Sequence, residues 1–134
     1  MTQTNIYAMD RIVDLLGSGM KFANALSHVY TKRKVVIPYN EVDLCVLLEN
    51  LGMSARTTNA LRRSRMTTLG DVVKYSESQH LKTIPNLGTL SIRETMETIL
   101  NYCWDNMSAK EKEKFLIDTV ERNSCNLRTD FLNV

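Results

Sequence analysis

Apolar residues recur at helical spacing along most of the chain, and glycines or capping residues separate one apolar pattern from the next. The first pattern runs from Ile6 through Met9, Ile12 and Val13 to Leu16 and stops at a Gly-Ser-Gly sequence. A second amphipathic pattern ends in three consecutive basic residues, which suit a helix C-terminus. Together the two patterns predict a helical hairpin at the N-terminal end of the chain.

Serine and threonine residues mark the predicted helix starts in the rest of the chain. A short helix is predicted over residues 41–51, and each of the five later helices follows a side chain that can accept hydrogen bonds from free N–H groups. Four of these have an acid or glutamine three residues later, the spacing of a capping box. The five predicted capping residues are Ser54, Thr68, Ser76, Ser91 and Ser108. No segment has convincing strand character, so the sequence predicts an all-α helical bundle.

Composition excludes several classes of protein. The 134 residues are 43% hydrophobic and 24% charged, ordinary values for one globular domain, and the net charge of +2 is too small to prove a polyanionic partner. Three widely spaced cysteines and two distant histidines predict reduced thiols and no metal site. We also expect no cofactor, and no enzymatic activity, because paired carboxylates, a Cys/His arrangement and a P-loop are lacking.

The expected location is the cytoplasm. No apolar run approaches about 18 residues, so no transmembrane helix is predicted. The first ten residues lack the basic and then apolar layout of a signal peptide.

The sequence IPNLG at residues 84–88 has the composition of a turn that binds anions. It joins a short helical segment to a longer one, which is the layout of a helix-hairpin-helix. Gly88 permits a positive φ and leaves room for a phosphate, while the N–H groups of residues 88–91 are expected to point outward at a positive helix end. Turns of this kind also join helices in proteins that bind nothing, so the turn alone does not establish DNA contact.

Arginines are concentrated in the segment SARTTNALRRSR. Four of them lie within ten residues with no acid in the segment, and Arg56, Asn59 and Arg63 share one face of a helix that begins at residue 55. Arginines without carboxylate partners suit phosphate binding or insertion into a narrow minor groove. A solvated basic face is the alternative interpretation.

Residues 48–100 resemble the C-terminal domain of the bacterial RNA polymerase α subunit. The resemblance rests on LGMSARTTNAL, on GDVV, and on LKTIPNLGTLSIRE, which occur in the family's order with one extra residue before Ile84. The family domain binds the minor groove of A/T-rich DNA upstream of promoters. By position, the resemblance implies that Arg56 enters the groove, that Asn59 assists it, and that Gly88, Ser91 and Glu94 lie at the DNA face.

Some positions depart from the family pattern. Leu90 stands where the family commonly has lysine, which should weaken phosphate binding unless Arg62, Arg63 or Arg93 compensates. Asn50 and Gly52 replace acids that face the σ factor in some members, so that contact is in doubt.

The expected organisation has three parts: an N-terminal hairpin over residues 1–40, the α-C-terminal-domain-like DNA-binding domain over 41–105, and a C-terminal helix with an irregular tail over 106–134. Because two short helices cannot bury both of their apolar stripes alone, the hairpin should dock on the domain or form a homodimer. We expect a stand-alone protein of bacterial, plasmid or phage origin, because this length cannot hold the large assembly domain of an α subunit.

Three functions fit these patterns. The first is a small, nucleoid-associated DNA-binding transcription regulator whose partner is A/T-rich duplex DNA. The second is a protein-interaction mimic of the polymerase domain, which docks on RNA polymerase, σ factor or an activator. The third is a repair or recombination accessory, which would explain the Gly88 turn but not the helix with Arg56 and Asn59. Retention of all three of these residues favours the first.

Overall fold

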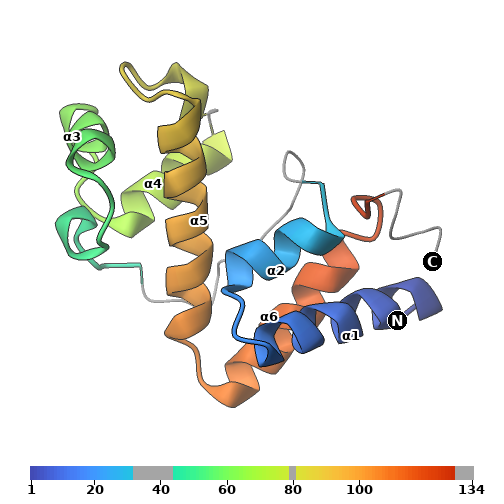
Figure 1. The fold of residues 1–134 in the computed structure, drawn as a ribbon. Helices are drawn as coiled ribbons and strands as arrows, with labels where there is room; N and C mark the ends of the chain where they lie inside the picture. The colour runs from blue at the N-terminus through green and yellow to red at the C-terminus, as the bar shows by residue number, and fades with distance from the viewer. Residues whose placement is uncertain (32–43, 79–80, 129–134) are drawn as a thin grey trace. The chain divides into compact units, whose positions relative to one another are not determined.

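The computed structural model of the protein describes residues 1–31, 44–78 and 81–128. Across these residues the secondary structure consists of six α-helices and two short 3-10 turns (Figure 1). The all-α fold predicted from the sequence is therefore confirmed. None of the described helices is long and apolar enough to cross a membrane.

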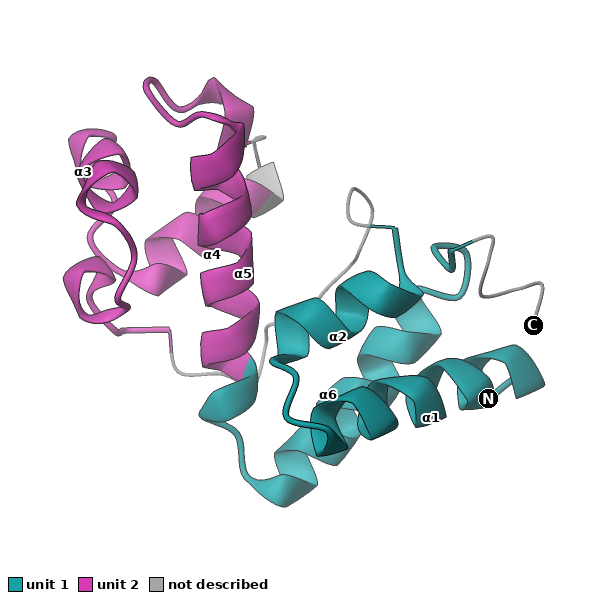
Figure 2. Cartoon of the chain, viewed as in Figure 1, with its two compact units in different colours: residues 1–42, 104–134 teal, residues 43–103 magenta. Residues whose placement is uncertain are grey.

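The protein divides into two compact units (Figure 2). Unit 1 consists of residues 1–42 and 104–134, and unit 2 consists of residues 43–103. Unit 1 is thus assembled from the two ends of the sequence, whereas unit 2 is one continuous stretch.

Unit 2 contains the 3-10 turns η2 (Leu48–Asn50) and η3 (Leu81–Thr83), the helices α3 (Ala55–Arg63) and α4 (Leu69–Ser78), and nearly all of α5 (Thr89–Asp105). Its core is aliphatic and includes the buried side chains of Leu48, Leu61, Leu69, Val72, Ile84, Leu87 and Ile99. Near the hairpin, the Tyr75 hydroxyl of α4 is hydrogen-bonded to the Thr83 hydroxyl of η3.

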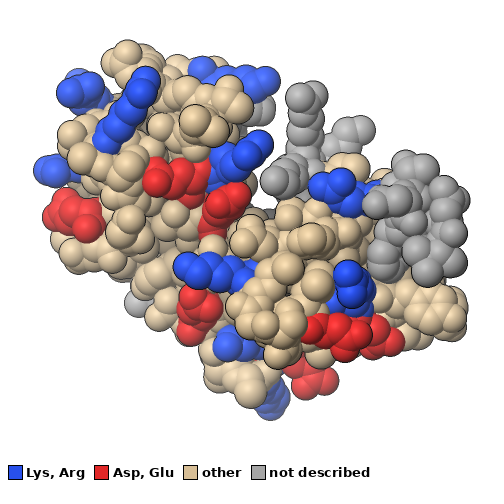
Figure 3. Space-filling view, viewed as in Figure 1, with Lys and Arg blue, Asp and Glu red and all other residues tan. Residues whose placement is uncertain are grey.

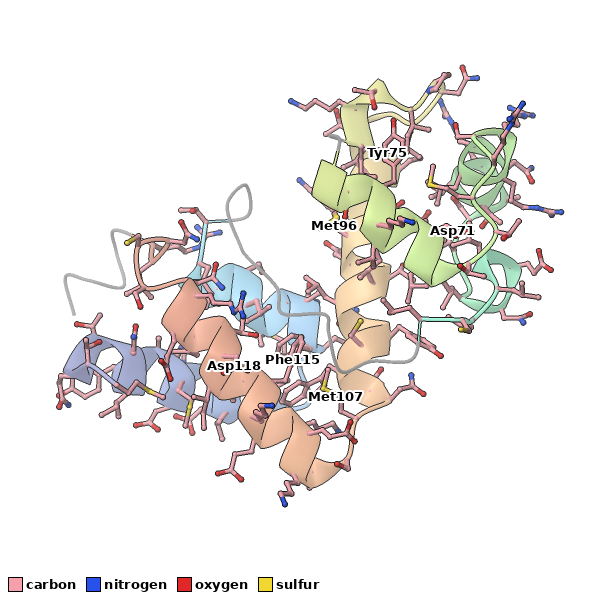
Figure 4. The ribbon with its side chains drawn as sticks, turned by 180° about the vertical axis from the view of Figure 1, so that it is seen from behind. Asp71, Tyr75, Met96, Met107, Phe115 and Asp118 are labelled. Carbon is pink, nitrogen blue, oxygen red and sulfur yellow. The ribbon has the colours of Figure 1, made fainter. Side chains whose placement is uncertain are left out.

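The start of α4 is a reciprocal cap. The Thr68 hydroxyl accepts a hydrogen bond from the Asp71 N–H at 3.2 Å, and the Asp71 carboxylate accepts from the N–H groups of Thr67 and Thr68 at 2.9 and 3.1 Å. Asp71 lies in the first turn of α4 in Figure 4. The N–H groups of Thr67 and Thr68 hold the pKa of this carboxyl below its usual range.

The prediction of an α-helix over residues 41–51 is wrong for residues 44–51, the part of that segment that the structure describes. The carbonyl groups of Leu44 and Val46 accept hydrogen bonds from the N–H groups of Gly70 and Leu69, at 2.8 and 3.0 Å, and Leu47 forms an isolated antiparallel bridge with Thr68. Only Leu48–Asn50 forms a helical turn, of the 3-10 type. Bonding to a segment about twenty residues away has replaced the local hydrogen bonds that a helix requires.

Three of the five predicted helix starts are confirmed and two are wrong. Ser54 and Ser108 cap α3 and α6, Ser108 within a complete capping box, and Thr68 caps α4 as described. Ser76 instead lies inside α4, where its hydroxyl donates to the Val73 carbonyl oxygen. Ser91 lies inside α5, which begins two residues earlier, so its side chain is available for another contact.

Unit 1 contains α1 (Gln3–Gly17), α2 (Phe22–Val29) and α6 (Ala109–Arg122), and α1 packs against both other helices. Phe22 is at the centre of its core: the ring stacks on Trp104 with centroids 4.4 Å apart and lies 5.9 Å from the Phe115 ring. Figure 4 shows Phe115 on α6 and Met107 just before that helix. Both of these side chains are buried.

The buried face of α1 differs from the predicted apolar stripe. Asn5, Ala8, Ile12 and Leu15 are buried, whereas Ile6 and Val13 remain 40% and 49% exposed. The predicted stripe therefore lies beside the buried face, and of its members only Ile12 belongs to the core. The predicted hairpin packs on α6, with the Asn5 amide donating to the Ser124 hydroxyl at 2.9 Å.

Candidate nucleic-acid interface

Helix α3 presents its charged and polar residues outward. Ser54 caps the helix by accepting from the Thr57 N–H at 3.3 Å, so α3 begins at Ala55, as expected from the sequence. Four residues form its buried face: Thr57, Thr58, Ala60 and Leu61. Arg56, Asn59 and Arg63 are all exposed, which is consistent with a shared outer face.

The arginines in α3 and just after it differ in whether they form an ion pair with an acidic side chain. Arg62 lies 3.6 Å from the Glu49 carboxylate, and both side chains are at least half exposed. The expectation that these arginines have no carboxylate partner is therefore wrong for Arg62. No ion pair forms at Arg56, Arg63 or Arg65 with any other residue in the described ranges. Figure 3 shows Lys and Arg side chains over the part of unit 2 that holds α3, with acidic side chains beside them.

The hairpin turn between η3 and α5 is built on two buried apolar side chains, Ile84 and Leu87. Asn86 between them adopts the left-handed conformation, with φ of 66°. Gly88 does not: Gly19 and Gly52 are the described glycines with positive φ. The left-handed residue of the turn is thus Asn86, a residue type that tolerates this conformation, and Gly88 must be explained in another way.

The space next to Gly88 is open. A Cβ atom built on Gly88 would meet no atom of the described residues within 4 Å beyond its own chain neighbours, and the residue is exposed. The Gly88 carbonyl oxygen accepts from the Ile92 N–H at 2.9 Å, so Gly88 immediately precedes the first turn of α5. A hydrogen in place of a side chain therefore leaves the N-terminal end of α5 accessible from outside, where free N–H groups favour an anion.

Polar side chains join the start of α3 to the start of α5. The Thr57 hydroxyl donates to the Ser91 hydroxyl at 2.9 Å. The Glu94 carboxylate accepts from the Ser54 hydroxyl at 2.9 Å and from the Ser54 N–H at 3.2 Å. These four residues form the α3–α5 junction, which places the helix that carries Arg56 beside the hairpin that carries Gly88.

The junction favours the ionised form of Glu94. Hydrogen bonding from the Thr57 side chain is the largest effect on the pKa of Glu94 and lowers it. Burial opposes this, but the side chain and N–H group of Ser54 lower the pKa further, so it lies below its usual range. Ser91 and Glu94 were predicted to lie at the DNA face, and in the structure both are half-exposed and form hydrogen bonds with residues at the start of α3. Ser54 and Thr57 were not predicted as site residues, although their (i, i+3) spacing at a helix start marks them as a cap.

The resulting surface combines three features: an arginine without an ion-pair partner in the described ranges, an amide on the same helix, and an open helix N-terminus in the hairpin. These suit a partner with regularly spaced negative charges. Within residues 1–31, 44–78 and 81–128 there is no cluster of His, Cys, Asp or Glu able to hold a metal ion.

An all-α unit with an arginine-bearing helix joined to a hairpin is the class of domain that the sequence resemblance implied, and comparisons with known proteins confirm that resemblance. Residues 39–101 match the family model for the C-terminal domain of the bacterial RNA polymerase alpha subunit. This match covers nearly all of unit 2 and little of unit 1.

Two curated relatives are DNA-directed RNA polymerase α subunits. The subunit from Aquifex aeolicus is 31% identical over 84 residues, which cover 59% of this protein and 26% of the relative. The subunit from Emiliania huxleyi is 29% identical over 96 residues, which cover 69% of this protein and 31% of the relative. The sequence thus spans roughly a quarter to a third of the length of these relatives. No solved structure matches it.

Proposed function

We propose that unit 2 binds duplex DNA and that the protein is a small, non-enzymatic transcription regulator. The observation that supports this most directly is the α3–α5 junction. It holds Arg56 and Asn59 on one side of a fixed joint and the open Gly88 hairpin on the other, so that one duplex can contact both. Arg56 enters the minor groove of A/T-rich DNA, Asn59 contacts the same groove, and the backbone near Gly88 contacts a phosphate.

Arginine suits this position for a physical reason. The minor groove of A-tracts is narrow and has an enhanced negative potential that attracts cationic side chains. The guanidinium group is more weakly hydrated than an ammonium group, so it loses less on entering the groove. With about four neutralised phosphates, log K should fall with log salt at a slope of about −3.6, and a single copy should bind with Kd of about 10⁻⁴–10⁻⁶ M.

The second candidate is a protein-interaction mimic that docks on RNA polymerase, σ factor or an activator. The ion pair between Arg62 and Glu49 favours this candidate, because an arginine paired with a carboxylate is less able to bind a DNA phosphate. In this case the basic face would contact an acidic protein surface, and no preference among DNA sequences would exist.

Titration of the 134-residue chain against an A-tract duplex and a G/C duplex at two salt concentrations separates the two candidates. Arg56→Ala should remove both affinity and the preference for A/T, and Arg56→Lys should restore little. Arg63→Ala is the matched control on the same helix. It should weaken both duplexes equally and flatten the salt slope by about 0.9.

Two outcomes would count against the proposal. If Arg56→Ala and Arg63→Ala behave alike on both duplexes, groove reading fails and only a basic face remains. If neither substitution changes DNA binding, the protein-interaction mimic replaces DNA binding. Pull-down from a bacterial lysate with and without nuclease then tests that candidate, since polymerase retained after nuclease treatment supports docking on protein.

We also propose that the protein acts as a homodimer in the cytoplasm, associated with the nucleoid. On α1, Ile6, Met9, Val13 and Leu16 follow the alternating three- and four-residue spacing of a helix seam, and this stripe lies outside the core of unit 1. A two-fold interface requires a patch that complements itself, which an uncharged apolar seam does. Two weak DNA-binding units held together would gain avidity of about 10²–10⁴. Sedimentation of the wild type and of Val13→Asp tests the dimer. If both proteins sediment as monomers, the homodimer proposal is overturned.

A further inference from the structure

We propose that the first turn of α5 makes a second, mostly apolar contact with DNA, in which Leu90 packs on the wall of the minor groove and Arg93 contacts the adjoining phosphate. This inference rests on the proposed DNA binding and adds two residues to the interface. Leu90 is 77% exposed, more than any other exposed large hydrophobic residue in the described part of the protein. Arg93 is also exposed and forms no ion pair with any described residue.

The position of Leu90 next to the α3–α5 junction ties it to Arg56. Thr57 and Ser91 are joined by a hydrogen bond of 2.9 Å, and Arg56 directly precedes the first of them while Leu90 directly precedes the second. Leu90 is also two residues from Gly88, at the open end of α5. A duplex that accepts Arg56 in its groove and brings a phosphate to Gly88 therefore passes over Leu90.

The chemistry of the groove wall fits an isobutyl group. The walls of the minor groove are lined largely by deoxyribose C–H groups, which form no strong hydrogen bonds. Apolar side chains also enter this groove in several classes of protein, where they wedge between base steps. Removing Leu90 from water against such a wall is favourable and does not depend on salt, because no counterion is released.

Arg93 lies one helical turn after Leu90, on the same face of α5. Its longer side chain is able to reach the phosphate that follows the sugar contacted by Leu90. The single lysine typical of the family position would thus be replaced by a pair, one residue supplying apolar contact and the other supplying charge.

The salt dependence of binding of the 134-residue chain to the A-tract duplex tests both contacts. Leu90→Ala should weaken binding about five- to tenfold at every salt concentration, with an unchanged slope. Arg93→Ala should weaken binding and flatten the slope by about 0.9. Leu90→Lys should steepen the slope by about 0.9, so that it binds more tightly than the wild type at low salt and more weakly at high salt.

Leu47→Ala is the matched control, since Leu47 is a 43% exposed leucine of the same unit that lies outside the hairpin. It should bind DNA as the wild type does, and melting temperatures confirm that each variant is folded. If Leu90→Ala binds like the wild type while Arg56→Ala does not, the apolar contact is overturned and DNA binding stands. The apolar contact is likewise overturned if Leu90→Lys binds more tightly at all salt concentrations. If Arg56→Ala also has no effect, the proposed function itself has failed.

Discussion

In unit 2 the two helices of the candidate interface are joined by hydroxyl and carboxylate groups, whereas in unit 1 the helices meet around stacked aromatic rings. The α3–α5 junction consists of hydrogen bonds between partly exposed groups at two helix starts. The unit 1 core has Phe22 and Trp104 with ring planes 2° apart, and Lys112 lies 5.4 Å from the Trp104 ring centroid. Hydrogen bonds fix direction, whereas the aromatic core contributes stability mainly through the large apolar area that its rings bury.

This difference supports the proposal that unit 2 contacts DNA. A groove-reading arginine is effective only if its helix has a defined orientation to the second contact, and the polar junction provides that. The family match agrees with this division, because it covers residues 39–101 and leaves out most of unit 1. In the proposed dimer, unit 1 supplies the exposed apolar stripe of α1 for pairing.

The largest effect is expected in the aromatic core. Phe115→Ala removes a buried ring that contacts Phe22 and should cost unit 1 about 3–5 kcal/mol. If the units are energetically separate, hydrogen exchange of unit 2 and binding to the A-tract duplex should be retained. A single shared unfolding transition, with loss of DNA binding at the same point, would show that unit 2 depends on unit 1.

Substitutions at two glycines of unit 2 distinguish an effect on core packing from an effect on access of DNA to the hairpin. A Cβ on Gly70 would lie 3.1 Å from the Leu44 carbonyl oxygen and 3.2 Å from its Cβ, so Gly70→Ala should destabilise unit 2 by about 1–2 kcal/mol despite the better helix propensity of alanine. Its folded fraction should bind DNA normally. The Cβ of Gly88→Val would lie in open space, so this variant should preserve the fold while weakening DNA binding. Thermal melts with duplex titrations measure both; normal binding by Gly88→Val would exclude close approach at the hairpin.

A smaller effect is expected at the polar junction. Glu94→Gln keeps the size of the side chain and removes the charge that accepts from Ser54, which should cost about 1 kcal/mol. DNA binding should weaken because α3 is less well aligned, although removing a negative charge would by itself strengthen it. Glu97→Gln makes the same charge change on α5 and is the control. Tighter binding by Glu94→Gln would show that the carboxylate only repels DNA.

The pH dependence of unit 2 follows from the same carboxylate. Because the pKa of Glu94 is lowered in the folded state, its stabilising contribution is fully present above the unfolded-state pKa of about 4.3 and is lost as pH falls through the folded value. Asp71 contributes with the same sign. Unfolding of the wild type below pH 5 should therefore depend more steeply on pH than unfolding of Glu94→Gln.

Local patterns in the sequence were sufficient for the fold class and for several boundaries. The start of α3 at Ser54, the capping box of Ser108 and Glu111, and the turn at residues 84–88 involve groups within four residues of one another. Each such pattern has its hydrogen-bond partners beside it in the sequence, so it can be read without knowing the tertiary structure. The resemblance of residues 48–100 to the polymerase domain came from the same short motifs.

Tertiary structure alone decided the features whose partners lie far apart in sequence. Residues 44–47 are extended because residues 67–70 take up their backbone hydrogen bonds, and Ser91 and Glu94 bond to side chains 34 and 40 residues away instead of capping α5. The same holds for Phe22 and Trp104, which stack although most of the sequence separates them, and for Ile6 and Val13, which stay exposed because Ile12 and Leu15 reach the core. Helical periodicity identifies apolar positions, but only the neighbouring helices determine which of them are buried.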